Sequence, residues 1–173
     1  MKDFIASKAT LEVELLDELT QIVEHPSYEI SSSNFYKLNT WKHKILENKG
    51  LVSCKTKAKV TYDNKVEQHI KINREPLAPY GTMLTIPIKT RASPSIRKPE
   101  SSTHFLEYGF KRPSRLLPLK ALRVFAFNTE TPVKIKEFEI IIHIPRDYKV
   151  MDYQAIHPAK KKKSTLNFEL NNL

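Results

Sequence analysis

Glycine and cysteine are both scarce in this sequence of 173 residues, and each shortage excludes a class of site. There are 3 glycines, which argues against the glycine-rich loops that bind the phosphates of nucleotides. Cys54 is the one cysteine, so neither an intramolecular disulfide nor a cysteine-based zinc cluster is available. A single thiol is typical of proteins from a reducing compartment, and we therefore expect an intracellular location.

Long apolar runs are also missing. The first residues, MKDFIASKATLEVELLDEL, carry acidic side chains where a secretory signal would be apolar. No stretch approaches the length that a membrane-spanning helix needs. We therefore expect any contact with a membrane to be peripheral.

The spacing of reactive side chains matches no known catalytic or metal-binding pattern. The 6 histidines show neither HxH nor HExxH spacing, and the sequence contains no G-x-S-x-G. Groups that lie far apart in a sequence can still form a catalytic triad in space. On these patterns we predict no enzyme, no metal and no cofactor.

Positive charge is abundant and unevenly distributed. Lys and Arg number 29 against 19 Asp and Glu, which gives a net charge of +10. Residues 1–50 hold slightly more acids than bases, whereas residues 51–173 hold about twice as many bases as acids. This asymmetry predicts surfaces with different partners, and the basic excess favours an anionic partner such as nucleic acid or acidic lipid. The alternative is a surface charge that only keeps the protein soluble.

Two helices are predicted in the first third of the chain. Leu11, Val13 and Leu15 alternate as in a strand, but the apolar residues from 15 to 23 recur at helical spacing. We predict a helix over residues 13–24 that ends before Pro26. A second helix is predicted over residues 33–48, with an apolar stripe made by Phe35, Leu38, Trp41, Ile45 and Leu46.

The rest of the chain predicts strands. Residues 52–62 and 66–72 alternate on either side of Asp63-Asn64, which is typical of a β-hairpin with a row of lysines on one face. Residues 83–89 predict an edge strand because they contain Pro87. Residues 122–127 and 138–144 predict buried central strands.

Together these elements predict an α+β fold. It has a mainly antiparallel β-sheet with one or two N-terminal helices packed on it. We expect a single domain over residues 1–155 and a basic C-terminal tail over residues 156–173.

The basic residues of three segments are the candidate anion-binding or nucleic-acid-binding site. They lie in the loop of residues 90–103, in the predicted turn of residues 111–115, and in the lysine run of the tail, which could also be a nuclear import signal. The predicted site residues are Arg91, Arg97, Lys98, Lys111, Arg112, Arg115, Lys160, Lys161, Lys162 and Lys163.

Aromatic residues lie among the cations of the middle segment. Phe105, Tyr108 and Phe110 could stack on bases while the cations bind phosphates, as in proteins that bind single-stranded nucleic acid. This favours, as an alternative function, an OB-like β-barrel that binds single strands. A basic accessory subunit of a ribonucleoprotein is a third possibility.

Two short motifs, Trp41-Lys42-His43 and Phe110-Lys111-Arg112-Pro113, resemble features of the matrix proteins of rhabdoviruses, in particular the short plant-virus type. The resemblance implies a non-enzymatic structural protein of the virion and the host cytoplasm. Such a protein would form a lattice with copies of itself and bind the nucleocapsid or its RNA and an acidic membrane. Two features depart from the family: the basic run is C-terminal here, and a proline-rich budding motif is absent.

Overall fold

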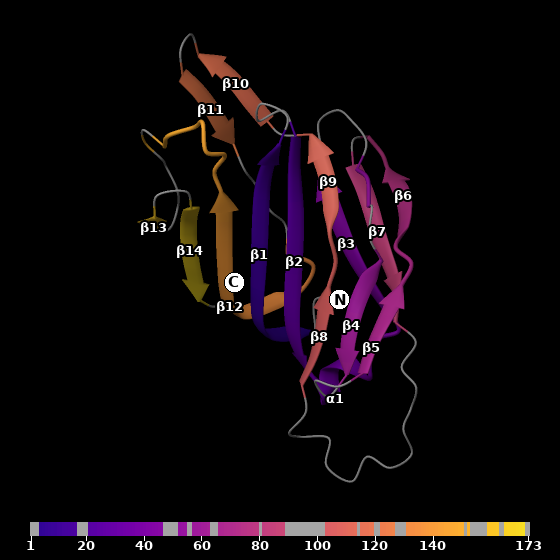
Figure 1. Cartoon of the computed structure of the whole chain (residues 1–173). Helices are drawn as coiled ribbons and strands as arrows, with labels where there is room; N and C mark the ends of the chain where they lie inside the picture. The colour runs from indigo at the N-terminus through magenta and orange to yellow at the C-terminus, as the bar shows by residue number, and fades with distance from the viewer. Residues whose placement is uncertain are drawn as a thin grey trace.

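The computed structural model of the chain describes residues 4–16, 21–46, 52–54, 57–62, 66–79, 81–88, 103–113, 115–119, 122–126, 131–150, 152, 159–162 and 165–171. These residues form sheets of nine, three and two strands (Figure 1). The one helix among them, α1 (Ser32–Phe35), is 4 residues long. The prediction of an α+β fold with N-terminal helices is therefore wrong, and the fold is nearly all β.

The nine-stranded sheet, called the main sheet below, has one parallel pair of strands, β1 (Ile5–Leu16) with β12 (Lys134–His143). Every other described pairing in the molecule is antiparallel. β9 (Phe110–Pro113) also pairs with β2. The order of the other strands is β13 (Ala159–Lys162), β14 (Thr165–Asn171), β12 (Lys134–His143), β1 (Ile5–Leu16), β2 (Gln21–Ser31), β8 (Thr103–Glu107), β4 (Ala58–Tyr62) and β5 (Val66–Ile70).

β1 and β2 form an antiparallel pair where the sequence predicts a helix over residues 13–24. Leu11 and Val13 are buried, whereas Glu12 and Glu14 are exposed, which is the two-residue period of a half-buried strand. β1 pairs with β2 on one side and with β12 on the other. These pairings outweigh the helical propensity of the segment, because propensity is a weak local preference.

Pro26 lies inside β2 and does not end an element. β9 pairs with β2 as far as Glu24, and β8 pairs with it from Ser27 onwards. The carbonyl of Pro26 accepts a hydrogen bond from the Tyr108 N–H at 3.2 Å on this side. Since the N–H and C=O groups of a strand residue point the same way, the missing N–H of the proline falls at the gap between β8 and β9.

β3 (Thr40–Leu46) takes the place of the predicted second helix. Trp41, His43 and Ile45 are buried, while their neighbours in the strand are exposed or half-buried. The prediction that Trp41 belongs to the core is confirmed, but it reaches the core from a strand. The spacing of Phe35, Leu38 and Trp41 imitates a helix because α1, a turn and β3 follow one another closely.

The second sheet has the order β3, β7 (Gly81–Pro87) and β6 (Asn73–Leu77). Leu84, Ile86 and Ile88 are buried as predicted. The prediction of an edge strand is wrong, because β7 has a neighbour on each side. Pro87 is tolerated as the last residue of the strand. The hairpin predicted around Asp63-Asn64 is confirmed by the pairing of β4 with β5.

The segment expected to be the centre of the sheet divides into two parts. β10 (Arg115–Leu119) and β11 (Leu122–Ala126) form a separate two-stranded sheet, so the central position predicted for residues 122–127 is wrong. β12 does lie inside the main sheet, and Phe138, Ile140 and Ile142 are buried as predicted. Beyond it, β13 and β14 extend the sheet where we expected a tail.

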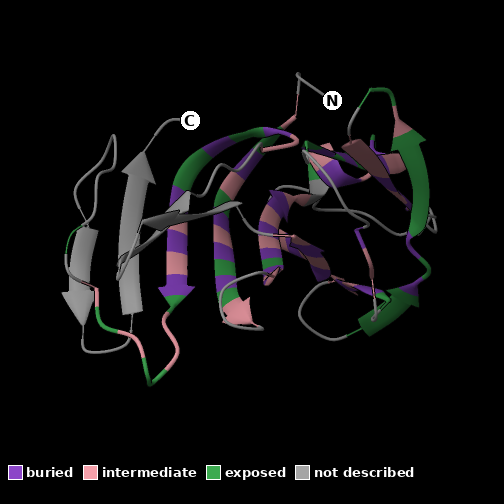
Figure 2. Cartoon of the chain, turned by 90° about the horizontal axis from the view of Figure 1, so that it is seen from above, coloured by how far each residue is buried: buried purple, intermediate pink, exposed green. Residues whose placement is uncertain are grey.

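The core lies between the inner face of the main sheet and the three-stranded sheet. The rings of Tyr28 on β2 and Trp41 on β3 meet with centroids 4.6 Å apart. Buried and more exposed residues alternate along most of the described strands (Figure 2). The main sheet therefore has an inner face, which contributes to the core, and an outer face made by the alternate side chains.

Candidate interaction surface

The Tyr108 hydroxyl is the centre of a buried polar cluster between the two larger sheets. The Trp41 indole N–H donates to it at 3.1 Å, and His43 Nδ1 lies 2.7 Å from it. The ring of Tyr28 stacks beside Tyr108 with a centroid distance of 6.2 Å. Because Trp41 and His43 come from β3 and Tyr28 comes from β2, these contacts connect the two sheets through polar atoms.

An ion pair between Glu24 and Arg112 lies on the same inner face. Glu24 comes from β2 and Arg112 from the adjacent β9, and Arg112 Nε donates to Glu24 Oε1. The two residues are 2% and 8% exposed. Burial raises the pKa of Glu24, and the charge and hydrogen bond of Arg112 oppose this shift in part. The effect of burial on this carboxyl group is therefore larger than the opposing effect of Arg112.

The buried groups have the chemistry of an active site but are closed to solvent. Burial raises the pKa of both Tyr28 and Tyr108, so both phenols stay protonated at neutral pH. No group of three or more His, Cys, Asp or Glu side chains in the described residues could hold a metal ion. We conclude that the cluster specifies how the sheets pack.

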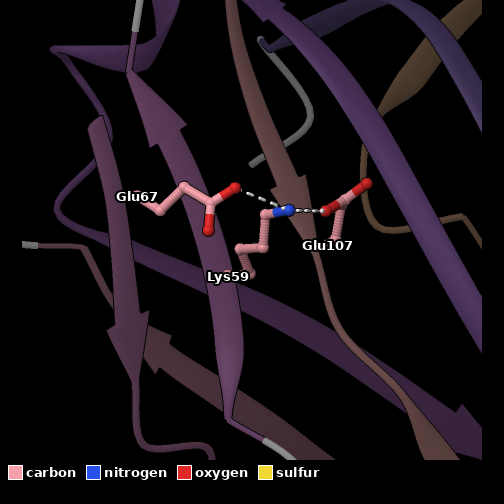
Figure 3. A network of polar contacts seen from close by, with 3 residues as sticks. All are labelled: Lys59, Glu67 and Glu107. Atoms are coloured by element: carbon pink, nitrogen blue, oxygen red, sulfur yellow. Dashed lines mark ion pairs between the residues drawn. The ribbon is translucent and has the colours of Figure 1, made fainter. Parts of the chain in front are cut away.

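The outer face of the main sheet carries both acidic and basic side chains. Lys59 on β4 contacts Glu67 on β5 at 2.9 Å and Glu107 on β8 at 3.4 Å (Figure 3). His143 Nε2 lies 3.5 Å from Glu12 Oε2. Among the described residues of this face, acids and bases are interspersed. The residues are Glu12, Glu14, Glu29, Glu67, Glu107, Glu137, Glu139, Lys8, Lys59, Lys111, Lys134 and Lys136.

The described residues of the predicted anion-binding set lie on three different strands. Lys111 and Arg112 lie on β9 and not in a turn, and their side chains point to opposite faces of the sheet. Arg112 is the buried partner of Glu24. Arg115 lies on β10 and the lysines of 160–162 on β13, in strands of different sheets. Four residues lie outside the described part: Arg91, Arg97, Lys98 and Lys163.

Two of the three rings proposed for base stacking face the core. Tyr108 is 4% exposed and Phe110 is 2% exposed, and each packs edge-on against His43. Phe105 is half-buried on the outer face. The three rings therefore do not form one open platform, which a single-stranded nucleic acid needs.

Sequence analysis missed the polar residues of the core. His43 could have been found from the alternation of Trp41, His43 and Ile45, which the helical pattern obscured. Nothing near Glu24 in the sequence marks it as buried, since its partner Arg112 is 88 residues away. None of the described helices is long and apolar enough to cross a membrane.

No protein-family model matches the sequence, and no curated protein is significantly similar to it. Solved structures do share the fold. Yeast LTA4 hydrolase in complex with bestatin matches with a TM-score of 0.52, 13% identity and 96% of this chain covered. A protein from Parabacteroides distasonis described as a candidate protease matches with a TM-score of 0.50, 12% identity and 98% covered. The chain spans 26% and 35% of those two proteins, so the likeness concerns one part of each.

Proposed function

We propose that the chain is a non-enzymatic β assembly module, which acts by associating with other protein chains, copies of itself included. The observation that carries the proposal is the likeness of nearly the whole chain to about a quarter and a third of two longer proteins. In those proteins a fold of this kind is one part of a longer chain. The polar core supports the same function, because the polar groups of Trp41, His43 and Tyr108 are buried and in contact with one another.

The expected anionic partners remain part of the proposal, but only as partners that bind non-specifically. The net charge of +10 favours non-specific binding to single-stranded RNA, to a nucleocapsid or to an acidic membrane. The self-association and the absence of catalysis are the parts of the proposal that come from the resemblance to matrix proteins.

The test is sedimentation of the purified chain over a range of protein and salt concentrations, with and without single-stranded RNA and acidic liposomes. We expect complexes that grow with protein concentration in the absence of RNA. A chain that is monomeric throughout, and joins larger particles only with RNA, would replace self-association by nucleic-acid binding. Hydrolysis of peptides, or binding of bestatin, by the isolated chain would overturn the non-enzymatic function.

A further inference from the structure

β5 ends the main sheet on one side with an open edge. Its one neighbour among the described strands is β4. The residues from Val66 to His69 are exposed, and Val66, at 62%, is the most exposed of the large apolar side chains in the described residues. β5 and β6 are the two largely exposed, green strands in Figure 2. An open edge presents a row of backbone N–H and C=O groups to which another strand can bind.

Two other edge strands carry residues that oppose such pairing. β13, at the opposite end of the main sheet, contains Lys160, Lys161 and Lys162. β6, at an edge of the three-stranded sheet, contains Pro76, which has no N–H to donate. Lysine and proline are the residues with which edge strands avoid binding one another. β5 has the sequence Val-Glu-Gln-His-Ile and contains neither.

We propose that β5 pairs antiparallel with β5 of a second copy, around a two-fold axis at Gln68. The sequence of the strand is complementary to itself in this register. Val66 then lies opposite Ile70 of the second copy, and Glu67 lies opposite the second copy's His69. Apolar residues meet apolar residues on one face, and a carboxylate meets an imidazole on the other, twice each. A shift by one residue would place side chains from opposite faces beside each other.

The existing contacts of the strand are compatible with this dimer. Glu67 already contacts Lys59 at 2.9 Å, and Lys59 also contacts Glu107 at 3.4 Å (Figure 3). A carboxylate has two oxygens and several acceptor positions, so Glu67 can accept from Lys59 and from the second copy's His69. Gln68 accepts a hydrogen bond from the Tyr62 hydroxyl at 3.1 Å through its side chain, which leaves its backbone unaffected. The contact is isologous and joins two main sheets edge to edge.

Cross-linking tests the register directly. In a background in which Cys54 is replaced by alanine, the variant Gln68→Cys places two thiols opposite each other across the axis, at a separation that a disulfide spans. The matched variant Val66→Cys places its two thiols about 13 Å apart, beyond the reach of a disulfide. We expect mild oxidation to link Gln68→Cys chains into dimers and to leave Val66→Cys chains unlinked. Dimers of Val66→Cys, or no dimers of either variant, would overturn the proposed pairing.

Charge exchange tests the Glu67–His69 pairs in solution. Sedimentation at moderate salt weakens longer-range non-specific association, while charges directly opposite each other across the β5 contact still interact. His69→Glu places two carboxylates opposite each other twice, and we expect it to weaken dimerisation about two- to thirtyfold. The double variant Glu67→Lys/His69→Glu should restore dimerisation, whereas Glu75→Lys on the edge strand β6 should leave it unchanged. Failure of the double variant to restore the dimer would contradict the register.

The inference rests on the proposed self-association and can fail separately from it. Association that persists while the β5 variants neither link nor weaken it would overturn the β5 contact and leave the proposed function standing. A chain that is monomeric at every concentration and salt would overturn both.

Discussion

The two faces of the main sheet carry similar ion pairs in opposite surroundings. On the inner face Glu24 and Arg112 pair with side chains that are 2% and 9% exposed. On the outer face Lys59 pairs with Glu67 and Glu107, whose side chains are 51% and 45% exposed. Desolvation makes a buried ion costly when its partner is removed, whereas water and salt screen an exposed one. Burial, and not the chemistry of the pair, therefore decides its weight in the fold.

The largest expected effect is the removal of one partner of the inner pair. Glu24→Leu leaves the Arg112 guanidinium buried without its carboxylate, and we expect the free energy of unfolding in urea to fall by about 3–5 kcal/mol. The double variant Glu24→Leu/Arg112→Leu removes both charges of this pair. Because replacing a buried ion pair by apolar side chains is commonly close to neutral, the double variant should recover most of the lost stability.

The control for this prediction is Glu12→Leu on the outer face. Glu12 lies on the central strand β1, and its side chain is 51% exposed. We expect a change of less than about 1 kcal/mol. If Glu24→Leu proved as mild as Glu12→Leu, water would have to reach Arg112, and the contrast between the two faces would be lost.

Alkaline pH should lower the free energy of unfolding, because two tyrosines are buried. Burial raises the pKa of Tyr28 and Tyr108 above the value of about 10 that an unfolded tyrosine has. A group whose folded pKa is raised contributes its full stability below the unfolded pKa and loses it as the pH rises through the folded one. We therefore expect the free energy of unfolding to fall above pH 10, by up to about 1.4 kcal/mol per pH unit for each tyrosine. Urea titrations at several pH values measure this slope.

Tyr28→Phe tests the origin of that slope. The variant loses one buried phenol, so its stability should fall less steeply above pH 10 than that of the wild type. The offset caused by the lost hydrogen bond to Tyr108 is present at every pH below this range and does not alter the slope. Equal slopes in the two proteins would mean that Tyr28 ionises as readily in the folded state as in the unfolded chain.

The strands that could be predicted are those whose alternation is uninterrupted. β4 and β5 flank a turn signal, and β7 and β12 carry regular apolar positions such as Leu84 and Ile140. The strands that were predicted as helices contain polar or proline residues at inward positions. Glu24 and Pro26 interrupt the pattern of β2, and His43 interrupts that of β3. Each is accommodated by a partner distant in sequence, which a local pattern does not contain.

The cationic site was less predictable than the strands. Lys111 and Arg112 are adjacent in sequence, but a strand directs adjacent side chains to opposite faces. The two adjacent charges are therefore divided between the two faces of the sheet. The proposed pairing of β5 differs in this respect, because its register follows from the five residues of the strand alone. It needs from the structure only the position of the strand at an open edge.

The smallest expected effect is the loss of the outer lysine. The hydrogen bond to Glu67 and the charge and hydrogen bond of Glu107 raise the pKa of Lys59, but the group is exposed, so its pairs are screened. We expect Lys59→Ala to leave the urea midpoint unchanged within error, at low salt and at high salt. The neighbouring variant Lys57→Ala, at an exposed position just before β4, is the matched control. The contrary result is a lower urea midpoint for Lys59→Ala that disappears in high salt and is absent in Lys57→Ala. It would mean that the three residues of Figure 3 stabilise the fold as one network, although their side chains are exposed.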